Sequence, residues 1–363
     1  MTTRSQEVFE PNYVSSPGDV IAEWLDERNM TQAELAMRLG MSAKTLNQIV
    51  KGRAPLTYTT ALKLERVTSI PARFWNAAEA DFQEFAMRTE ANRELEDEDA
   101  FPAKFPVAFL RKIGYIKSLK SDNSGIIQDL LSFFQVADTQ SWEGYWKNQV
   151  LAFRKSSVYE SKIGSVAAWL RLGEIQAEDQ SLEPFNQRIL YNALPKLRAC
   201  TLIKDPNVFL PKIQKILNNA GIAFVVLKEI PGTHCSGVTR WVLDKPIVQL
   251  SLRHKTDDHL WFTLFHEIAH ILLHPKNLTY LTSEDIDGSR DSKRLEDEAN
   301  RYAQELMIPA IHALEIPGLT SKSAIFDFAQ KLGIAPGIVV GRLQKENYIK
   351  YSFGNELKVK YTF

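Results

Sequence analysis

Two histidines and a glutamate in the C-terminal half of the chain have the spacing of a zinc site. His266, Glu267 and His270 form an HExxH sequence. On a helix, residues four apart lie one above the other on the same face, so two imidazoles can converge on one cation. Glu267, next to the first imidazole, could reach a metal-bound water and accept its proton. The pattern predicts a Zn²⁺ centre with His266 and His270 as ligands and Glu267 as general base.

Catalytic zinc needs a third protein ligand and one position left open for water. The stretch LEDEANRYAQELM predicts a helix with one apolar stripe, formed by Leu295, Ala299, Tyr302, Ala303 and Leu306. Glu298 falls within this stripe, whereas Glu296 falls on the polar face. A carboxylate in an apolar stripe is costly unless it meets a cation or hydrogen-bond donors. The spacing therefore favours Glu298 as the third ligand, with Glu296 as the alternative.

Two further histidines flank this constellation. His274 lies four residues after His270 and could be a ligand, but a histidine at a helix C-terminus stabilised by the helix dipole is the favoured interpretation. His234, in a Gly-containing turn, could orient a substrate or simply be exposed.

The elements that position these groups change in texture around residue 222. Runs 223–227 and 246–252 are β-branched and apolar and predict strands. A nearly all-apolar helix is expected over 259–274, then a loop over 277–290, a helix to Pro309, two more helices and a terminal strand. The strand at 246–252 could hold an extended peptide by edge pairing. This pattern indicates an α+β domain.

These motifs resemble the ImmA/IrrE metallopeptidases. HEIAHILLH, EDEANRYAQELMIP and the upstream PIVQLSLRHKTDDHLWFTLF occur in the same order, and the similarity extends from about 205 to 345. The resemblance implies a zincin-like fold in which a Glu of the EAN segment completes a two-histidine site. It also implies a protein substrate, often a repressor.

A second constellation lies near the N-terminus. In TQAELAMRLGMSAKTLNQIVKG, Thr31 and Glu34 form a predicted capping box, Gly40 ends the first helix and Ser42 caps the next. Two short helices around such a turn predict a helix-turn-helix. Most of the residues expected to contact DNA belong to the second helix: Ala43, Lys44, Thr45, Asn47, Gln48 and Lys51. Gln32, at the start of the first helix, is expected to contact DNA as well. A small helical bundle for protein contacts is the alternative.

This segment resembles Xre/Cro-type helix-turn-helix domains, and the PARFW that follows is similar to HigA-type antitoxins. The resemblance implies a homodimer on a palindromic double-stranded DNA operator and, in some members, a toxin partner. The long C-terminal part departs from the short antitoxin pattern.

Composition restricts the remaining possibilities. The 44 basic and 44 acidic residues cancel, so DNA must be held by a local patch. The stretch from Arg38 to Arg73 contains seven basic residues and a single acidic residue, Glu65. Two isolated cysteines suit a reducing cytosol, no apolar run reaches the length of a membrane helix, and no secretory signal is visible. A cytoplasmic protein is expected.

The predicted protein is therefore multi-domain: an all-α helix-turn-helix domain over 1–88, an acidic linker or exposed helix end and a helical middle region over 89–204, and an α+β zincin-like domain over 205–363. The favoured function is a DNA-binding transcriptional regulator with a zinc-dependent endopeptidase that cleaves itself or a partner regulator. The alternative is a HigA-like antitoxin or repressor with a non-catalytic, metal-binding sensor domain.

Overall fold

A computed structural model describes residues 13–147, 150, 163–233, 235–251, 253, 255–274, 276, 280–283 and 290–362. The chain divides into two compact units, Met1–Asp99 and Ala100–Phe363. Each unit has a hydrophobic core of its own. The predicted fold class, with an all-α first part, a helical middle and an α+β C-terminal part, is confirmed.

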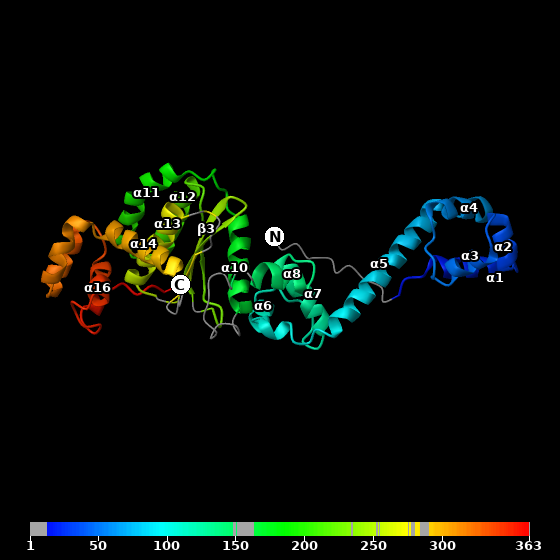
Figure 1. Cartoon of the computed structure of the whole chain (residues 1–363), viewed down its shortest axis with the longest axis horizontal. Helices are drawn as coiled ribbons and strands as arrows, with labels where there is room; N and C mark the ends of the chain where they lie inside the picture. The colour runs from blue at the N-terminus through cyan, green and yellow to red at the C-terminus, as the bar shows by residue number, and fades with distance from the viewer. Residues whose placement is uncertain are drawn as a thin grey trace. The chain divides into compact units, whose positions relative to one another are not determined.

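The described part of the first unit, from Tyr13 onward, is built from five helices: α1 (Pro17–Glu27), α2 (Gln32–Leu39), α3 (Ala43–Val50), α4 (Tyr58–Thr68) and α5 (Ala72–Glu96) (Figure 1). Polar side chains open the first four, since Ser16, Thr31, Ser42 and Thr57 each accept a backbone N–H of the first turn. Gly40 ends α2 with φ 66°, a left-handed conformation that costs glycine little.

The predicted capping box at α2 is only half formed. The Thr31 hydroxyl accepts the Glu34 N–H at 3.2 Å, but the Glu34 carboxylate pairs with Arg38 at 2.7 Å. A guanidinium four residues along the helix competes successfully for the carboxylate.

The hydrophobic core of the first unit includes two tryptophans; its members are Ile21, Trp24, Leu25, Leu35, Ala36, Leu39, Leu46, Ile49, Leu56, Ala61, Leu64, Ala72 and Trp75. Trp75 is completely buried, and its indole N–H donates to the Ile70 carbonyl at 3.2 Å. The acidic stretch 89–96 is the exposed end of α5, so the expected boundary after residue 88 falls within a helix.

The second unit begins with short helical segments around an aromatic core. They are η1 (Pro102–Lys104), α6 (Val107–Lys112), α7 (Asn123–Phe134), α8 (Thr139–Trp142), the π-helical turn η2 (Glu143–Lys147) and the buried α10 (Ile163–Glu178). The rings pack edge to face or tilted, with centroids 4.8–5.8 Å apart, in a cluster of Phe101, Phe105, Phe133, Phe134, Trp142 and Trp146. The middle region thus belongs to the same compact unit as the sheet that follows it.

A four-stranded sheet lies at the centre of this unit, with strand order β1-β3-β2-β4. Its strands are β1 (Ala223–Leu227), β2 (Cys235–Val242), β3 (Lys245–Ser251) and β4 (Tyr280–Ser283). β1 runs parallel to β3, whereas β2 is antiparallel to both β3 and β4, with Val238 opposite Gln249 and Leu281. Leu243 and Asp244 connect β2 to β3 with φ 48° and 62°, the signature of a two-residue type I′ turn.

β1 and β3 were predicted from the sequence; β2 and β4 were not. β2 carries Thr239 and Arg240 as buried residues beside Gly237, so the usual alternation of apolar and polar side chains is lost. The edge pairing expected for 246–252 is wrong, because β3 lies between β1 and β2 and both its edges are occupied.

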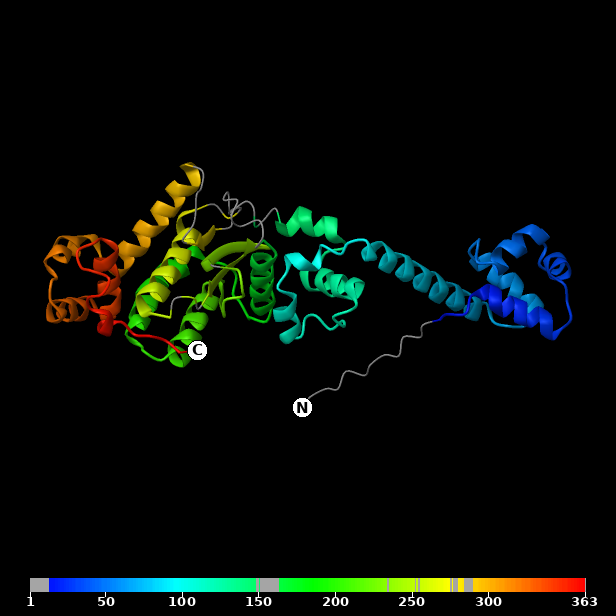
Figure 2. The same ribbon diagram turned by 90° about the horizontal axis from the view of Figure 1, so that it is seen from below.

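Helices cover both faces of the sheet. α10 packs on β1 and β3, whereas α12 (Pro206–Asn219) and α13 (Asp257–Leu273) pack on the other side (Figures 1 and 2). The remaining helices are α11 (Gln187–Ala199), η4 (Cys200–Leu202), α14 (Arg290–Met307), η5 (Ala310–Gly318), α15 (Lys322–Leu332), α16 (Pro336–Lys345) and η6 (Asn355–Leu357). In place of the expected terminal strand, Lys360 forms a single antiparallel bridge with Thr256.

Among the described residues, no single helix has both the length and the apolar character to cross a membrane. The bent pair α15 and α16, which meet at 117°, satisfies those two criteria only when taken together.

Candidate metal centre and candidate nucleic-acid interface

α13 brings the two histidines of the HExxH sequence together. The helix is buried on almost every side, and His266 and His270 are each 1% exposed. One helical turn separates them, so their Nε2 atoms lie 2.9 Å apart. Two imidazole nitrogens aimed at the same point are arranged as a pair of metal ligands is.

Glu296 of α14 completes this group. Its carboxylate oxygens lie 3.1 Å from His266 Nε2 and 3.5 Å from His270 Nε2. One possible ligand atom from each of the three side chains, a ring nitrogen or a carboxylate oxygen, lies within 4.8 Å of the other two. Two nitrogens and one carboxylate oxygen form a donor set that suits Zn²⁺.

The favoured third ligand, Glu298, does not face the histidine pair. Its carboxylate lies 3.4 Å from His274 Nε2 and 3.2 Å from Arg294. The face of α14 that packs on α13 carries the buried Ala299, Ala303 and Met307, and Glu296 is three, seven and eleven residues before them. Two residues correspond to a rotation of about 200° around the helix, so Glu298 and Glu296 point to nearly opposite sides. The predicted apolar stripe included Tyr302 and Leu306, which are only half-buried and lie at the edge of this face. Their inclusion shifted the predicted stripe toward Glu298.

His274 occupies the C-cap of α13, as expected, but its side chain is buried and belongs to the cluster. Its Nδ1 lies 2.8 Å from His270 Nδ1. Burial lowers the pKa of His274, with Glu298 opposing the effect, so the neutral imidazole is favoured instead of the protonated form that a helix dipole would stabilise. His234 lies outside the described residues.

The pKa values of the two central histidines shift in opposite directions, because only His266 is near carboxylates that outweigh the effect of burial. Burial lowers the pKa of His270, and positive charge on His266 or His274 lowers it further. Burial also acts on His266, but the hydrogen bond that its imidazole donates to Glu296 and the negative charge of Glu267 outweigh burial and raise the pKa of His266. A neutral His270 is in the state that a metal ligand requires.

Glu267 is completely buried between α13 and β2. Its backbone carbonyl accepts a hydrogen bond from Thr239 Oγ1 at 2.9 Å. A Cβ atom on Gly237 would come within 2.5 Å of Glu267 Oε1, so only glycine leaves room for the carboxylate as it lies. Sequence reasoning missed both β2 residues, because nothing in the local pattern marks this strand or shows that it packs against the HExxH helix.

In the first unit, α3 presents most of the residues expected to meet DNA. Ala43, Lys44, Thr45, Gln48 and Lys51 are all exposed. Asn47 is half-buried and donates to Gln32 Oε1 at 3.1 Å, which connects α3 to the start of α2. This amide pair is placed to orient α3, whereas Lys44 and Gln48 stand free to reach outward.

The surroundings of α3 are positively charged. No ion pair among the described residues involves Lys44, Lys51 or Arg53. The one acid in this stretch, Glu65, accepts the N–H of Ala72 and caps α5. A surface of unpaired cations of this kind suits a polyanion.

Comparison with known proteins finds a separate match for each unit. Residues 21–75 match the helix-turn-helix family HTH_3, and residues 225–344 match the IrrE N-terminal-like domain of the M78 peptidases. A curated relative, the uncharacterized HTH-type transcriptional regulator YddM of Escherichia coli (strain K12), is 36% identical over 59 residues, which are 16% of this chain and 63% of that protein. A crystal structure of a hypothetical protein from E. coli aligns over 30% of this chain and 96% of that protein, at 19% identity and a TM-score of 0.20.

Proposed function

Because the chain joins an Xre-type helix-turn-helix domain to an M78, IrrE N-terminal-like peptidase domain, we propose that it is a DNA-binding transcriptional regulator with a zinc-dependent endopeptidase activity. The observation that carries this proposal is the convergence of His266, His270 and Glu296 beside a buried Glu267.

The side chains of the cluster fit a zinc ion. His266, His270 and Glu296 would hold it through two imidazole nitrogens and one carboxylate oxygen. When bound, zinc would polarise the scissile carbonyl and lower the pKa of the attacking water. Glu267 would accept a proton from this water and pass it to the leaving amine.

The substrate we propose is a protein, either this chain itself or a partner regulator. A metal domain that senses without turnover, in a HigA-like antitoxin or repressor, is the second candidate. The position of Glu267 favours catalysis, because a purely structural or sensing site has no use for a buried general base next to its ligands. A toxin partner and a homodimer stay predictions.

Elemental analysis of the purified protein tests the metal site, with Glu296→Ala compared against Glu298→Ala. The two variants remove the same side chain two residues apart on one helix. About one zinc per chain is expected in the wild type and in Glu298→Ala, with a sharp loss in Glu296→Ala. Equal loss in both variants, or no zinc in the wild type after chelator-free purification, would contradict the ligand set.

For the first unit we propose that α3 enters the major groove of an operator, with Gln48 and Lys44 toward base edges and Lys51 toward phosphate. Operators can be selected from a random duplex library with the full-length protein. Selected duplexes with two related half-sites would support a dimer. Failure to enrich any sequence, with non-specific binding only, would contradict a sequence-reading role.

A further inference from the structure

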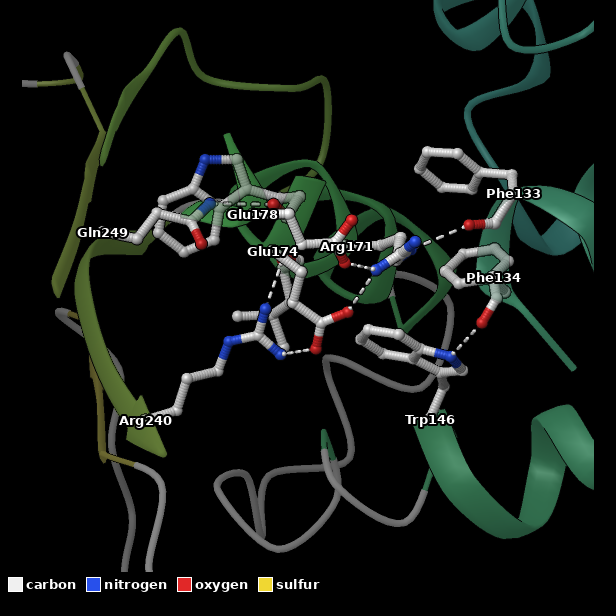
Figure 3. Close-up of polar contacts among 10 residues, drawn as sticks. Phe133, Phe134, Trp146, Arg171, Glu174, Glu178, Arg240 and Gln249 are labelled. Carbon is white, nitrogen blue, oxygen red and sulfur yellow. Dashed lines mark hydrogen bonds and ion pairs between the residues drawn. The ribbon is translucent and has the colours of Figure 1, made fainter. Parts of the chain in front are cut away.

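A buried carboxylate joins two arginines inside the second unit. Glu174 of α10 accepts from Arg171 at 2.8 Å through one oxygen and from Arg240 of β2 at 2.7 Å through the other. The side chains of the three residues are between 1% and 9% exposed. Figure 3 shows the two guanidinium groups approaching Glu174 from opposite sides.

Each arginine also binds a backbone carbonyl. Arg171 Nε donates at 2.9 Å to Phe133, at the end of α7, and Arg240 donates to Leu170 of α10. Gln249 of β3 reaches α10 as well, and donates to Trp169 at 2.8 Å. The approach is possible only because Gly173 carries no side chain, since a Cβ there would lie 1.8 Å from Gln249 Oε1. α10 is thereby fixed to two adjacent strands by directional contacts (Figure 3).

The opposite face of β2 touches the proposed general base. Successive residues of a strand point to opposite faces, so Arg240 faces α10 while Gly237 and Thr239 face α13. Thr239 donates to the Glu267 carbonyl, and Gly237 lies against the Glu267 carboxylate. An unbroken series of contacts therefore leads from α7 through Arg171, Glu174, Arg240 and β2 to Glu267.

We propose that β2 sets the position of the Glu267 carboxylate, and that Glu174 in α10 holds β2 in place through Arg240. Glu174, Arg240 and Thr239 are then positioning residues for the proposed peptidase reaction, on which this inference rests. This gives the helical region before the sheet a function in the proposed reaction, since its helix α10 carries the Glu174 that binds Arg240 of β2.

Stability alone is a poor explanation for this cluster. The cost of removing two guanidinium groups and a carboxylate from water offsets most of their attraction, so a buried ion pair adds little net stability over apolar side chains of similar size. Directional hydrogen bonds fix the register and orientation of the strand against the helix, which apolar packing specifies less strictly. A general base needs such precision, because a displacement of about 1 Å can cost on the order of 10²-fold in rate.

Hydrogen exchange of the zinc-loaded, full-length protein tests the anchor, with Glu174→Gln compared against Glu178→Gln. Glu178 is on the same helix and contacts Arg171, but its side chain is 60% exposed and no bond to Arg240 is present. Exchange about tenfold faster or more in β2 and around Glu267 is expected for Glu174→Gln only. Unchanged exchange there, or faster exchange spread evenly over the unit including α15 and α16, would overturn the proposal.

Thr239 offers a variant that leaves the buried charges intact. Thr239→Val keeps the shape of the side chain but removes the hydroxyl, and Thr239→Ser restores it. Rates of self-cleavage or of fluorescein-casein cleavage should fall about tenfold or more in Thr239→Val at unchanged zinc content, and recover in Thr239→Ser. Equal rates in all three proteins would overturn the role of Thr239. If the wild type cleaves nothing, the peptidase proposal fails, and the exchange comparison still decides whether Glu174 holds β2 and the Glu267 segment.

Discussion

The two units place their candidate functional residues in opposite surroundings. In the first, Lys44, Gln48 and Lys51 are exposed on α3 or directly after it, outside the hydrophobic core of the unit. In the second, His266, Glu267 and His270 are buried within a helix, and their contacts come from α14 and β2. A surface that reads a large polyanion needs exposed donors, whereas metal-assisted hydrolysis needs ligands and a base held away from bulk water. Substitutions should therefore separate function from folding in the first unit and couple them in the second.

The sharpest test of the second unit is Glu267→Gln. Loss of a general base reduces catalysis by about 10²–10⁴-fold, and zinc content should stay the same because the glutamate is not a ligand. The measurement is the cleavage rate beside elemental analysis, with the exposed Glu305→Gln of α14 as control. A Glu267→Gln protein that cleaves as fast as the control would remove the catalytic assignment.

Trp75→Ala tests whether the units are energetically separate. Truncating this completely buried indole should cost the first unit about 3–5 kcal/mol, since its ring fills the core and its N–H binds Ile70. Calorimetry should show one transition moving down, while zinc content and cleavage stay unchanged. A joint shift of every transition would show that the units unfold together.

Changes of pH should affect the stabilities of the two units in opposite directions, since acid should destabilise the first unit and a rising pH should destabilise the second. Hydrogen bonds from the backbone and side chain of Ser16 lower the pKa of Asp19 in the first unit, so that contribution is lost as the pH falls through the lowered pKa. In the second unit, burial and the charge of Asp258 raise the pKa of Asp257 from 3.8 to about 7, against the pull of Lys358. Folding then favours the protonated acid, and stability declines as the pH rises from about 4 to 7.

The Asp257 contribution is roughly 4 kcal/mol at most, and Asp257→Asn should abolish it. Unfolding free energies of the second unit at pH 5 and pH 8 provide the measurement, as a difference between variant and wild type. Identical pH profiles for the two proteins would show that the buried acid does not titrate in this range.

The smallest effects are expected at α3. Gln48→Ala should cost about 1–3 kcal/mol on a selected operator and relax preference at one base pair. Lys51→Ala should weaken binding to all duplexes and reduce the salt slope by about one. Fluorescence anisotropy at several salt concentrations separates these outcomes, with Lys120→Ala in the second unit as control. Any change in melting temperature from either α3 variant would weaken the contrast between the units.

Much of the fold is predictable because its signals are local. The caps at Ser16, Thr31 and Ser42 and the left-handed Gly40 depend on residues within one turn. β1 and β3 are marked by their own side chains. β2 is not, since its buried Arg240 makes sense only beside Glu174, which is 66 residues away in the chain.

The helix-turn-helix and the pairing of His266 with His270 are predictable from the chain alone, because helical spacing puts the residues concerned on a common face. The tertiary packing is what brings Glu296, and not Glu298, against the histidine pair, since this depends on how α14 is rotated against α13. It also shows that β2 contacts Glu267 and that Arg240 of this strand pairs with Glu174. Periodicity gives the side chains that share a face of one element, whereas the face that meets a neighbour is set by packing between elements.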